Sequence, residues 1–438
     1  MKVRGPSHTR FSQHHYQLEI EYYADTPITP QEAEEEREEV YSSDVPFVQR
    51  IEECLHRYRN KRRIQTKNAQ YFSEFLFLGG IDCQPRQFQG GVESEGTIAS
   101  EFKAATGLET VHHGGGGSAY YNNTLKDAGH WDVDFTGVLA GYLSISVPRM
   151  TWGNERDVKE AIGVVRNFYN YVLMHDVCPE YKDDIRRALR LCDTGEEEIK
   201  LVYLARQRLP GQFSLACQEL FLPKAEQTPH ENNWVRFVRP KKFDPKTFFC
   251  AVLAFLQPEL AKKSQDIEKR HLVNEMDVDL EIVSIHRPGA SNSNIFRRLP
   301  SESGEQVYHP VGTMECKYIR LQDGYDLRDC DLAQPLGDQD TFFLDDIILE
   351  KLKVGMKLRV TVCELDSGVK FFKNAPSIYP TFYTFLPQEL MRHYKEPVEN
   401  PRPAPSANSY FGEGDIFDDE IVEGEQDVGD KEEVEDQG

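Results

Sequence analysis

The period of the hydrophobic pattern changes near residue 275, and this change constrains the fold more than any other feature. Before it, apolar side chains recur every three or four residues, as in the stripe Val158, Ala161, Ile162, Val165, Phe168, Tyr169 and Val172. After it, apolar and polar residues alternate, as in Val278, Leu280 and Ile282. The first spacing is typical of helices and the second of half-buried strands. We therefore expect an α+β fold with a mainly helical N-terminal half and a β-rich, largely antiparallel C-terminal half.

Composition shifts predict four segments. Residues 1–20 are polar and are expected to be disordered. A mainly helical domain is expected over 21–275, with a long glycine-containing loop over 84–130. A β-rich domain follows over 276–395, and 396–438 should form a proline-rich linker and a disordered acidic tail. A loop as long as 84–130 inside a compact domain is either functional or disordered.

More than half of the net negative charge lies at the C-terminus. The formal net charge is −22, and the segment Phe411–Gly438 alone contains thirteen acidic residues and one Lys. Such a tail is expected to be solvated and disordered. The remaining chain is mildly acidic, which argues against broad, non-specific binding of nucleic acid and leaves room for one local basic patch.

Cysteine usage and hydropathy predict the compartment. The nine cysteines are scattered and form no CxxC pair, which is typical of reduced, intracellular proteins and not of disulfide frameworks or zinc modules. The N-terminus lacks the apolar core of a signal peptide, and no apolar run is long enough to span a bilayer. We expect a protein of the nucleus and cytoplasm, without membrane contact.

Several helix and strand ends can be predicted from single residues. Thr29 and Glu32 can form a capping box, and Asn154 can cap the next strong helix. The run Asp193–Glu196 predicts a break followed by a new helix. In the C-terminal half, Asp366–Gly368 predicts a hairpin turn, and Pro380 places the segment Ile378–Leu386 at a sheet edge.

Motifs for catalysis are hard to find. The chain contains no phosphate-binding GxxxxGK[ST], no GxGxxG after a strand, no GxSxG and no HExxH. We therefore expect no catalytic residue, cofactor or metal. The alternative is a metal-dependent nuclease that uses Asp279 and Glu315 as Mg²⁺ ligands and Lys317 beside the developing charge. Charged residues on the wet face of an amphipathic strand explain the same pattern more simply.

Three further pairs have spacings that metal sites use. His130 and Asp132 have the spacing of an iron-binding triad but lack a second His, and His112–His113 lies in the long loop. His175 and Cys178, with Cys192 further on, would leave zinc short of a fourth ligand. Loop residues, core cysteines and a histidine at a helix end are the simpler interpretations.

One basic cluster is a candidate for partner or RNA contact. It comprises Arg57, Arg59, Lys61, Arg62 and Arg63 at the end of a predicted helix. These cations could bind phosphate, a negative protein surface or an import receptor. They could equally form a solvated helix C-terminus, where positive charge suits the helix dipole. Both interpretations stay open.

Long blocks in the helical half resemble one protein family. The chain is similar to the fungal Argonaute-binding subunits of the Argonaute siRNA chaperone (ARC) complex. The matching blocks follow one another in the family's order: Tyr22–Glu36, Val45–Arg63, Tyr71–Gly91, Trp131–Pro148, Val164–Leu189 and Leu209–Phe221. The β-rich half resembles the family less distinctly.

The resemblance implies a non-enzymatic role in RNA interference. Members of this family look like partners that hold Argonaute with duplex small RNA, restrain slicing and passenger-strand release, and support small-RNA-directed heterochromatin. A second ARC subunit is implied as a partner, and the family supplies no catalytic motif. A structural subunit of an unrelated nuclear complex is the blander alternative.

The step Trp152–Gly153 is a second candidate contact. Exposed Trp-Gly steps can insert the indole into Argonaute-type pockets. Because Trp152 directly precedes the capped helix at Asn154, we expect it to be buried in the core or in a hydrophobic staple.

Overall fold

The computed structural model describes residues 29–61, 64, 66–82, 112–113, 133–224, 239–240, 243–299, 308–323 and 337–393. All of them belong to one compact unit, Met1–Tyr394, and a second unit comprises Lys395–Gly438. The predictions made for residues 1–20, for the acidic tail and for nearly all of the 84–130 loop lie outside the described residues.

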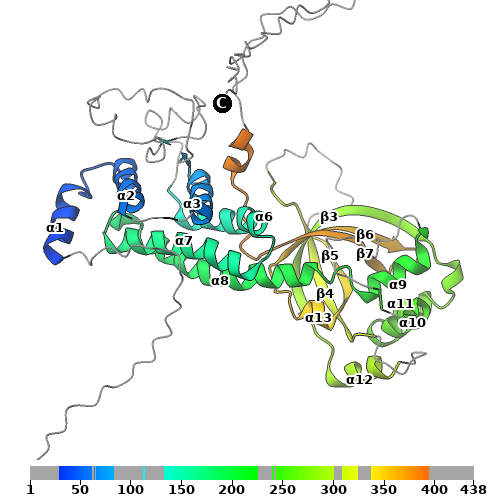
Figure 1. Ribbon diagram of the computed structural model, residues 1–438. Coiled ribbons are helices and arrows are strands. Elements are labelled where there is room, and N and C mark those ends of the chain that lie inside the picture. Colours follow the sequence, from blue (N-terminus) through cyan, green and yellow to red (C-terminus); the bar gives the residue numbers. More distant parts are fainter. Residues whose placement is uncertain are drawn as a thin grey trace, which may run out of the picture. The chain divides into compact units, whose positions relative to one another are not determined.

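The N-terminal half is helical (Figure 1). Its elements are α1 (Pro30–Glu39), α2 (Phe47–Lys61), α3 (Thr66–Leu78), α5 (Phe135–Gly141), the π-helix η2 (Tyr142–Ser146), α6 (Val147–Thr151), α7 (Glu155–Met174), the 3₁₀ turn η3 (Pro179–Tyr181) and α8 (Lys182–Arg206). The predicted caps are confirmed, because Thr29 and Glu32 form the capping box and Asn154 accepts from two amides of α7.

Aromatic rings fill the centre of this half. Tyr58 of α2 contacts Phe72 of α3 and Phe168 of α7, with ring centroids 5.5 and 5.4 Å apart. All three rings are almost fully buried. Aromatic contacts of this kind add to the free energy gained by burial alone, so the aromatic stretch of α7 is the centre of the helical core.

Helix α8 departs from the sequence-based expectation. The predicted break at Asp193–Glu196 is wrong, because α8 continues through it to Arg206. Gly195 is buried, and a Cβ placed there would lie 2.6 Å from Leu143 Cδ1. The glycine thus permits close approach of η2 to α8, and this packing outweighs its low helix propensity.

The C-terminal half is built on a five-stranded sheet. Its strands are β3 (Leu272–His286), β4 (Val311–Ile319), β5 (Gln339–Asp345), β6 (Lys357–Leu365) and β7 (Lys370–Tyr379). The order is β5-β4-β3-β6-β7, and every neighbouring pair is antiparallel. The α+β prediction and the hairpin between β6 and β7 are confirmed. Strand β7 lies at an edge and ends directly before Pro380, so only the first two residues of the predicted strand Ile378–Leu386 belong to a strand.

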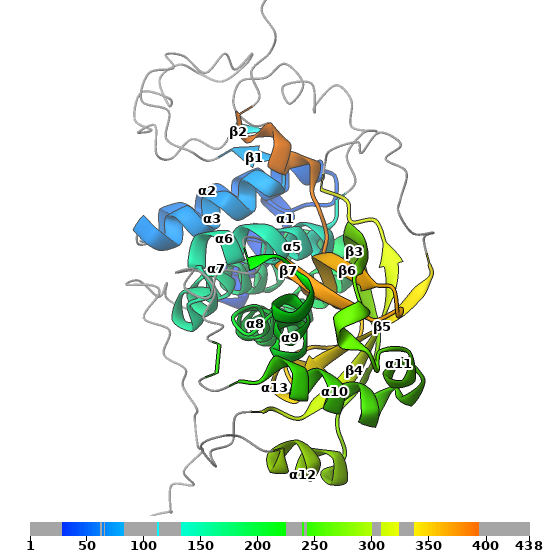
Figure 2. The ribbon, with the colours of Figure 1, turned by 90° about the vertical axis from the view of Figure 1, so that its right-hand side faces the viewer.

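Helices cover both faces of the sheet. Ala205 of α8 and Leu209, three residues beyond the end of that helix, pack on one face beside Met276, Leu280 and Leu358. The opposite face contacts α9 (Gln212–Phe221) and α10 (Pro245–Leu256) through a second apolar cluster. Figure 2 shows these two helices beside the sheet, with α11 (Pro258–Lys263) following them. The smaller elements are β1 (Ile81–Asp82), β2 (His112–His113), η5 (Ile267–Lys269), α12 (Ala290–Arg298), α13 (Asp346–Leu349) and η6 (Pro387–His393).

Hydrophobic contacts therefore group α9 and α10 with the strands. The domain boundary expected at residues 275 and 276 stays a prediction, since residues 29–393 fall within one compact unit. Among the described residues, no helix combines the length and apolar character needed to cross a membrane.

Helix α9 also occupies an edge of the sheet. Gln218 Nε2 donates to the carbonyl oxygens of Phe372 and Lys373, at 2.9 and 3.1 Å, and the Phe372 amide donates to Ser214 Oγ at 3.2 Å. These side chains satisfy backbone groups that an edge strand would otherwise offer to another chain.

After β7 the chain returns to the helical half. The buried carboxylate of Glu198 on α8 accepts hydrogen bonds from the amide and hydroxyl of Thr381. The Thr384 amide donates to Ser144 Oγ, and Glu389 pairs with Arg149 at 3.3 Å. We call Thr381–Glu389 the return segment.

Candidate partner interface

The first cation of the predicted basic cluster, Arg57, forms ion pairs within the protein. Arg57 donates to Glu36 of α1 at 2.9 Å and to Glu53 of its own helix at 2.7 Å. Glu36 is only 8% exposed, so its charge requires a partner. Arg57 therefore joins α1 to α2, and its guanidinium is committed within the protein.

The structure describes the other cations of the cluster only in part. Arg59 is half-buried, and its Nη1 has no hydrogen-bond partner among the described residues. Lys61 is the last residue of α2, and the position of its side chain is not described. Arg62 and Arg63 lie outside the described residues. Only Arg57 can thus be removed from the set of candidate contacts on structural grounds.

His175 completes the buried polar group around Glu36. Its Nδ1 lies 2.5 Å from Glu36 Oε2, and its ring lies against Tyr171 with centroids 3.9 Å apart. Burial raises the pKa of Cys178 and that of Cys192 to about 12, so both thiols are neutral near pH 7. Within the described residues no three His, Cys, Asp or Glu side chains gather as a metal site would require. The interpretation of His175 and Cys178 as parts of a packed helix junction agrees with these contacts.

The structure describes only one of the two remaining candidate pairs. His112–His113 forms a short antiparallel pairing with Ile81–Asp82, and His130 and Asp132 lie outside the described residues.

The three residues of the nuclease alternative lie apart. Asp279 accepts from Arg359 at 2.8 Å and from the Leu321 amide at 3.0 Å. Its partner across the sheet is Ile319, and Glu315 lies four residues further along β4, or roughly 13 Å at about 3.3 Å per residue. Two carboxylates at this separation cannot share one Mg²⁺ ion.

Lys317 and Glu315 each have another partner. Lys317 pairs with Glu281 across the strands at 3.3 Å, and Glu315 accepts from Ser284 Oγ at 2.6 Å. These are the cross-strand contacts of an amphipathic sheet. The geometry thus matches the simpler interpretation of these charges.

One constellation was missed in the sequence because its members come from different strands. Ser284 Oγ lies 3.2 Å from His286 Nε2 as well as near Glu315. In a Ser-His-acid triad the imidazole lies between the hydroxyl and the carboxylate and removes the hydroxyl proton. Here the hydroxyl lies in the middle and donates to the carboxylate, so the imidazole cannot activate it.

The position of Trp152 contradicts the expectation from sequence. The prediction of a buried Trp is wrong, because this side chain is 67% exposed. Trp152 ends α6 in the left-handed conformation, with φ 51° and ψ 28°, and Gly153 follows with φ 73°. The turn directs the chain into the Asn154 cap of α7 and leaves the indole at the surface.

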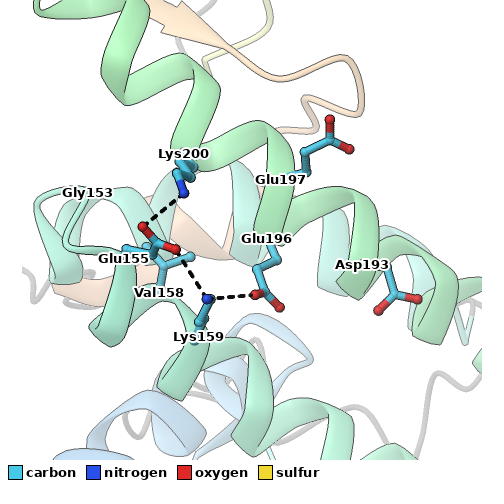
Figure 3. Close-up of a pocket in the computed structure, with 8 residues that line it drawn as sticks. All are labelled: Gly153, Glu155, Val158, Lys159, Asp193, Glu196, Glu197 and Lys200. Atoms are coloured by element: carbon cyan, nitrogen blue, oxygen red, sulfur yellow. Dashed lines mark hydrogen bonds and ion pairs between the residues drawn. The ribbon is translucent and has the colours of Figure 1, made fainter. Parts of the chain in front are cut away.

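A shallow hollow of about 320 Å³ begins at Gly153 and runs between α7 and α8. Its charged lining comes from both helices, as Figure 3 shows: Glu155, Lys159, Asp193, Glu196, Glu197 and Lys200. Glu155 pairs with Lys200 at 3.0 Å and with Lys159 at 3.2 Å, and these two lysines hold the pKa of Glu155 below its usual value. Such paired groups offer no uncompensated charge to a small ligand.

These features describe an α+β protein in which one candidate contact residue, Trp152, is exposed. The chain belongs to the family described as Argonaute siRNA chaperone (ARC) complex subunit Arb1, whose model matches residues 18–397. It is also similar to Argonaute-binding protein 1 of Schizosaccharomyces pombe, with 30% identity over 202 residues. That match covers 45% of this chain and 47% of the relative, so the chain spans about half the length of that protein. No solved structure matches the chain.

Proposed function

We propose that the chain is a non-catalytic regulator in RNA interference that binds Argonaute carrying duplex small RNA. In this proposal it restrains slicing and passenger-strand release, works with a second ARC subunit, and supports small-RNA-directed heterochromatin formation. The protein would act in both the nucleus and the cytoplasm. The family match over residues 18–397 carries the proposal. The name of the S. pombe relative supports Argonaute as the partner.

The arrangement of polar residues supports a binding role over the nuclease alternative. Asp279 and Glu315 are held apart by the register of β3 and β4, and each is bonded to another side chain. We therefore assign no catalytic role to them.

A purification and a slicing assay test the proposal together. The full chain, expressed with an affinity tag in its own cells, should recover Argonaute and the second subunit at mild salt. Purified Argonaute loaded with duplex small RNA should release its passenger strand more slowly when the chain is added. Recovery without Argonaute, or cleavage of the duplex by the chain alone with Mg²⁺, would contradict the proposal.

The basic cluster can be tested with the ion pair between Arg57 and Glu36 left in place. Reversing Lys61, Arg62 and Arg63 to Glu, with Arg57 left intact because it pairs with Glu36, should weaken association of the complex with RNA. Removing three phosphate contacts should also make the salt dependence of RNA binding less steep. The measurement is binding of labelled duplex to the reconstituted complex at several salt concentrations.

Arg186 and Arg187 supply a matched control for that experiment, since both are exposed cations on α8. Their reversal to Glu should leave RNA association unchanged. Equal binding by both variants and the unmodified chain would favour the solvated helix end.

A further inference from the structure

We infer that the first turn of α9, residues 212–215, is a proton-sensitive switch that opens locally when Asp345 releases its proton to water. We call these residues the bridging turn, because their hydrogen bonds reach both edge strands of the sheet, β5 and β7. The switch lies in the β-rich half and does not depend on the proposed function.

The bridging turn is bonded to one edge strand on each side. The Gln212 amide donates to Asp345 Oδ2 at the end of β5, at 3.0 Å. Ser214 Oγ accepts from the Phe372 amide of β7 at 3.2 Å. The two strands also meet directly, since the rings of Phe342 and Phe372 stack with centroids 4.7 Å apart. A change at Asp345 can therefore reach a backbone group of β7 through one helical turn.

Asp345 is buried and poorly supplied with hydrogen-bond donors. Its Oδ1 has no hydrogen-bond partner among the described residues. A buried carboxylate needs several donors or a paired cation, whereas a protonated carboxyl carries no charge. Burial accordingly raises the pKa of Asp345 to about 7. The closed turn thus favours the protonated form, and loss of the proton favours an arrangement that admits water.

Two segments next to the bridging turn carry ionisable side chains. Arg208, two residues beyond α8, is exposed and opposes the raised pKa of Asp345 only in part. His309, before β4, donates its backbone amide to Gln212 Oε1 at 2.8 Å. Burial and Arg208 both lower the pKa of the His309 ring, so the ring is neutral near pH 7. Burial of Asp345 thus outweighs Arg208, and the neutral imidazole adds no charge that would stabilise the ionised form.

The backbone before the bridging turn can accommodate a local opening. Gly211 has φ 86°, a left-handed conformation that glycine adopts and leaves at little steric cost. Phe213 opposes opening, because its ring is buried and lies 4.9 Å from the ring of Phe343 in β5. Opening is therefore a minority event, and hydrogen exchange detects events of this kind.

Proton linkage determines the direction of the switch. The pKa of Asp345 is about 7 in the closed turn, and the ordinary value of about 3.9 applies once the carboxyl is hydrated. The closed turn therefore binds more protons between these two values, so opening becomes easier as the pH rises. The equilibrium constant for opening should increase roughly tenfold per pH unit between about pH 5 and pH 7 and then level off. Opening also frees the Phe372 amide, a group that an edge strand can offer to another chain.

The test follows hydrogen exchange in the full chain at several pH values. Protection factors, which compare each rate with that of an unstructured peptide, remove the intrinsic effect of pH. The amides of Gln212, Leu215 and Phe372 report on the bridging turn, and those at the centre of β3, the central strand, report on global unfolding. We expect the first three to be protected roughly tenfold less than the β3 amides. They should also respond less to urea, because a local opening exposes little surface.

Two variants assign the proton. Asp345→Asn keeps an acceptor for the Gln212 amide and cannot ionise, so the protection of the bridging turn should change much less with pH. Asp346→Asn is the matched control. It removes the next carboxylate, which pairs with Arg287 at 2.6 Å, and should keep the pH dependence of the unmodified chain.

Two results would overturn the switch. Equal protection and equal urea dependence for the bridging turn and for β3 would mean that the turn opens only when the whole protein unfolds. This comparison needs only the unmodified chain, so it decides even if Asp345→Asn does not fold. A pH dependence that persists in a folded Asp345→Asn variant would assign the proton to another group.

Discussion

Replacing Asp345 by Asn is expected to remove much of the pH dependence of stability between about pH 4 and pH 7. Asp345 is 2% exposed at the end of β5. One carboxylate oxygen accepts from the Gln212 amide at 3.0 Å, and the other has no hydrogen-bond partner among the described residues. Burial raises the pKa of Asp345 to about 7, against the opposing effects of the Gln212 amide and Arg208.

The sign of the effect follows from proton linkage. An Asp in the unfolded chain has a pKa near 3.9, so between that value and about 7 the folded state binds more protons than the unfolded state. Stability is therefore lost as the pH rises through this window. At about 1.4 kcal/mol per pKa unit, the free energy of unfolding should fall by up to about 4 kcal/mol.

Urea unfolding at several pH values measures this effect. Asn keeps an oxygen for the Gln212 amide and carries no charge. The slope of the free energy of unfolding against pH should therefore become smaller in Asp345→Asn. His309 acts in the opposite direction, because burial lowers its pKa and favours the folded state as the pH rises. Comparison of the variant with the unmodified chain cancels that contribution. Asp346→Asn, which removes the surface partner of Arg287, should keep the slope. Identical slopes for Asp345→Asn and the unmodified chain would contradict the raised pKa.

Glu36→Ala is expected to cost about 2–3 kcal/mol of stability and to release α1 from the helical half. The variant leaves Arg57 and the buried His175 without their shared carboxylate. Removing one partner of a fully buried ion pair costs about 3–5 kcal/mol, and the value here should be lower because the Arg57 side chain is 32% exposed. Helix α1 is mostly acidic, and Glu36 is its one buried residue, so little else holds it.

Hydrogen exchange can locate that loss. Backbone amides of α1 should exchange faster in Glu36→Ala, while those in the centre of α7 should keep most of their protection. Glu35→Ala is the matched control, since Glu35 is exposed on the same helix and accepts from Gln31. A variant in which α1 exchanges at its normal rate would show that apolar contacts alone hold this helix.

Local signals predicted the helix caps, the hairpin and the alternating strands, because these depend on neighbouring residues. Strand β5 was missed because it does not alternate. Phe342, Phe343 and Leu344 are all buried, since helices cover both faces of the sheet at this strand. The break predicted in α8 is wrong for a related reason. Gly195 allows close packing against Leu143 of η2, a helix that is distant in sequence.

The candidate contact residues also depend on neighbours that are distant in sequence. A run of cations is visible in the sequence, but the partner of Arg57 is a glutamate 21 residues away on another helix. The exposure of Trp152 follows from the geometry of one turn, and the residues around it gave the opposite expectation. Pairing and exposure are tertiary properties, and they decide which residues of a motif can meet a partner.

The return segment has a consequence for how the protein is made. Phe382 and Leu386 pack against the helical core, and the bond from Thr384 to Ser144 joins residues 240 positions apart. At roughly 5–20 residues per second, a ribosome adds the second partner on the order of tens of seconds after the first. The helices therefore emerge from the ribosome long before their core can be completed. During that interval the unfinished helical half exposes apolar surface, and a nascent chain of this kind depends on assistance or on slow, late closure to avoid aggregation.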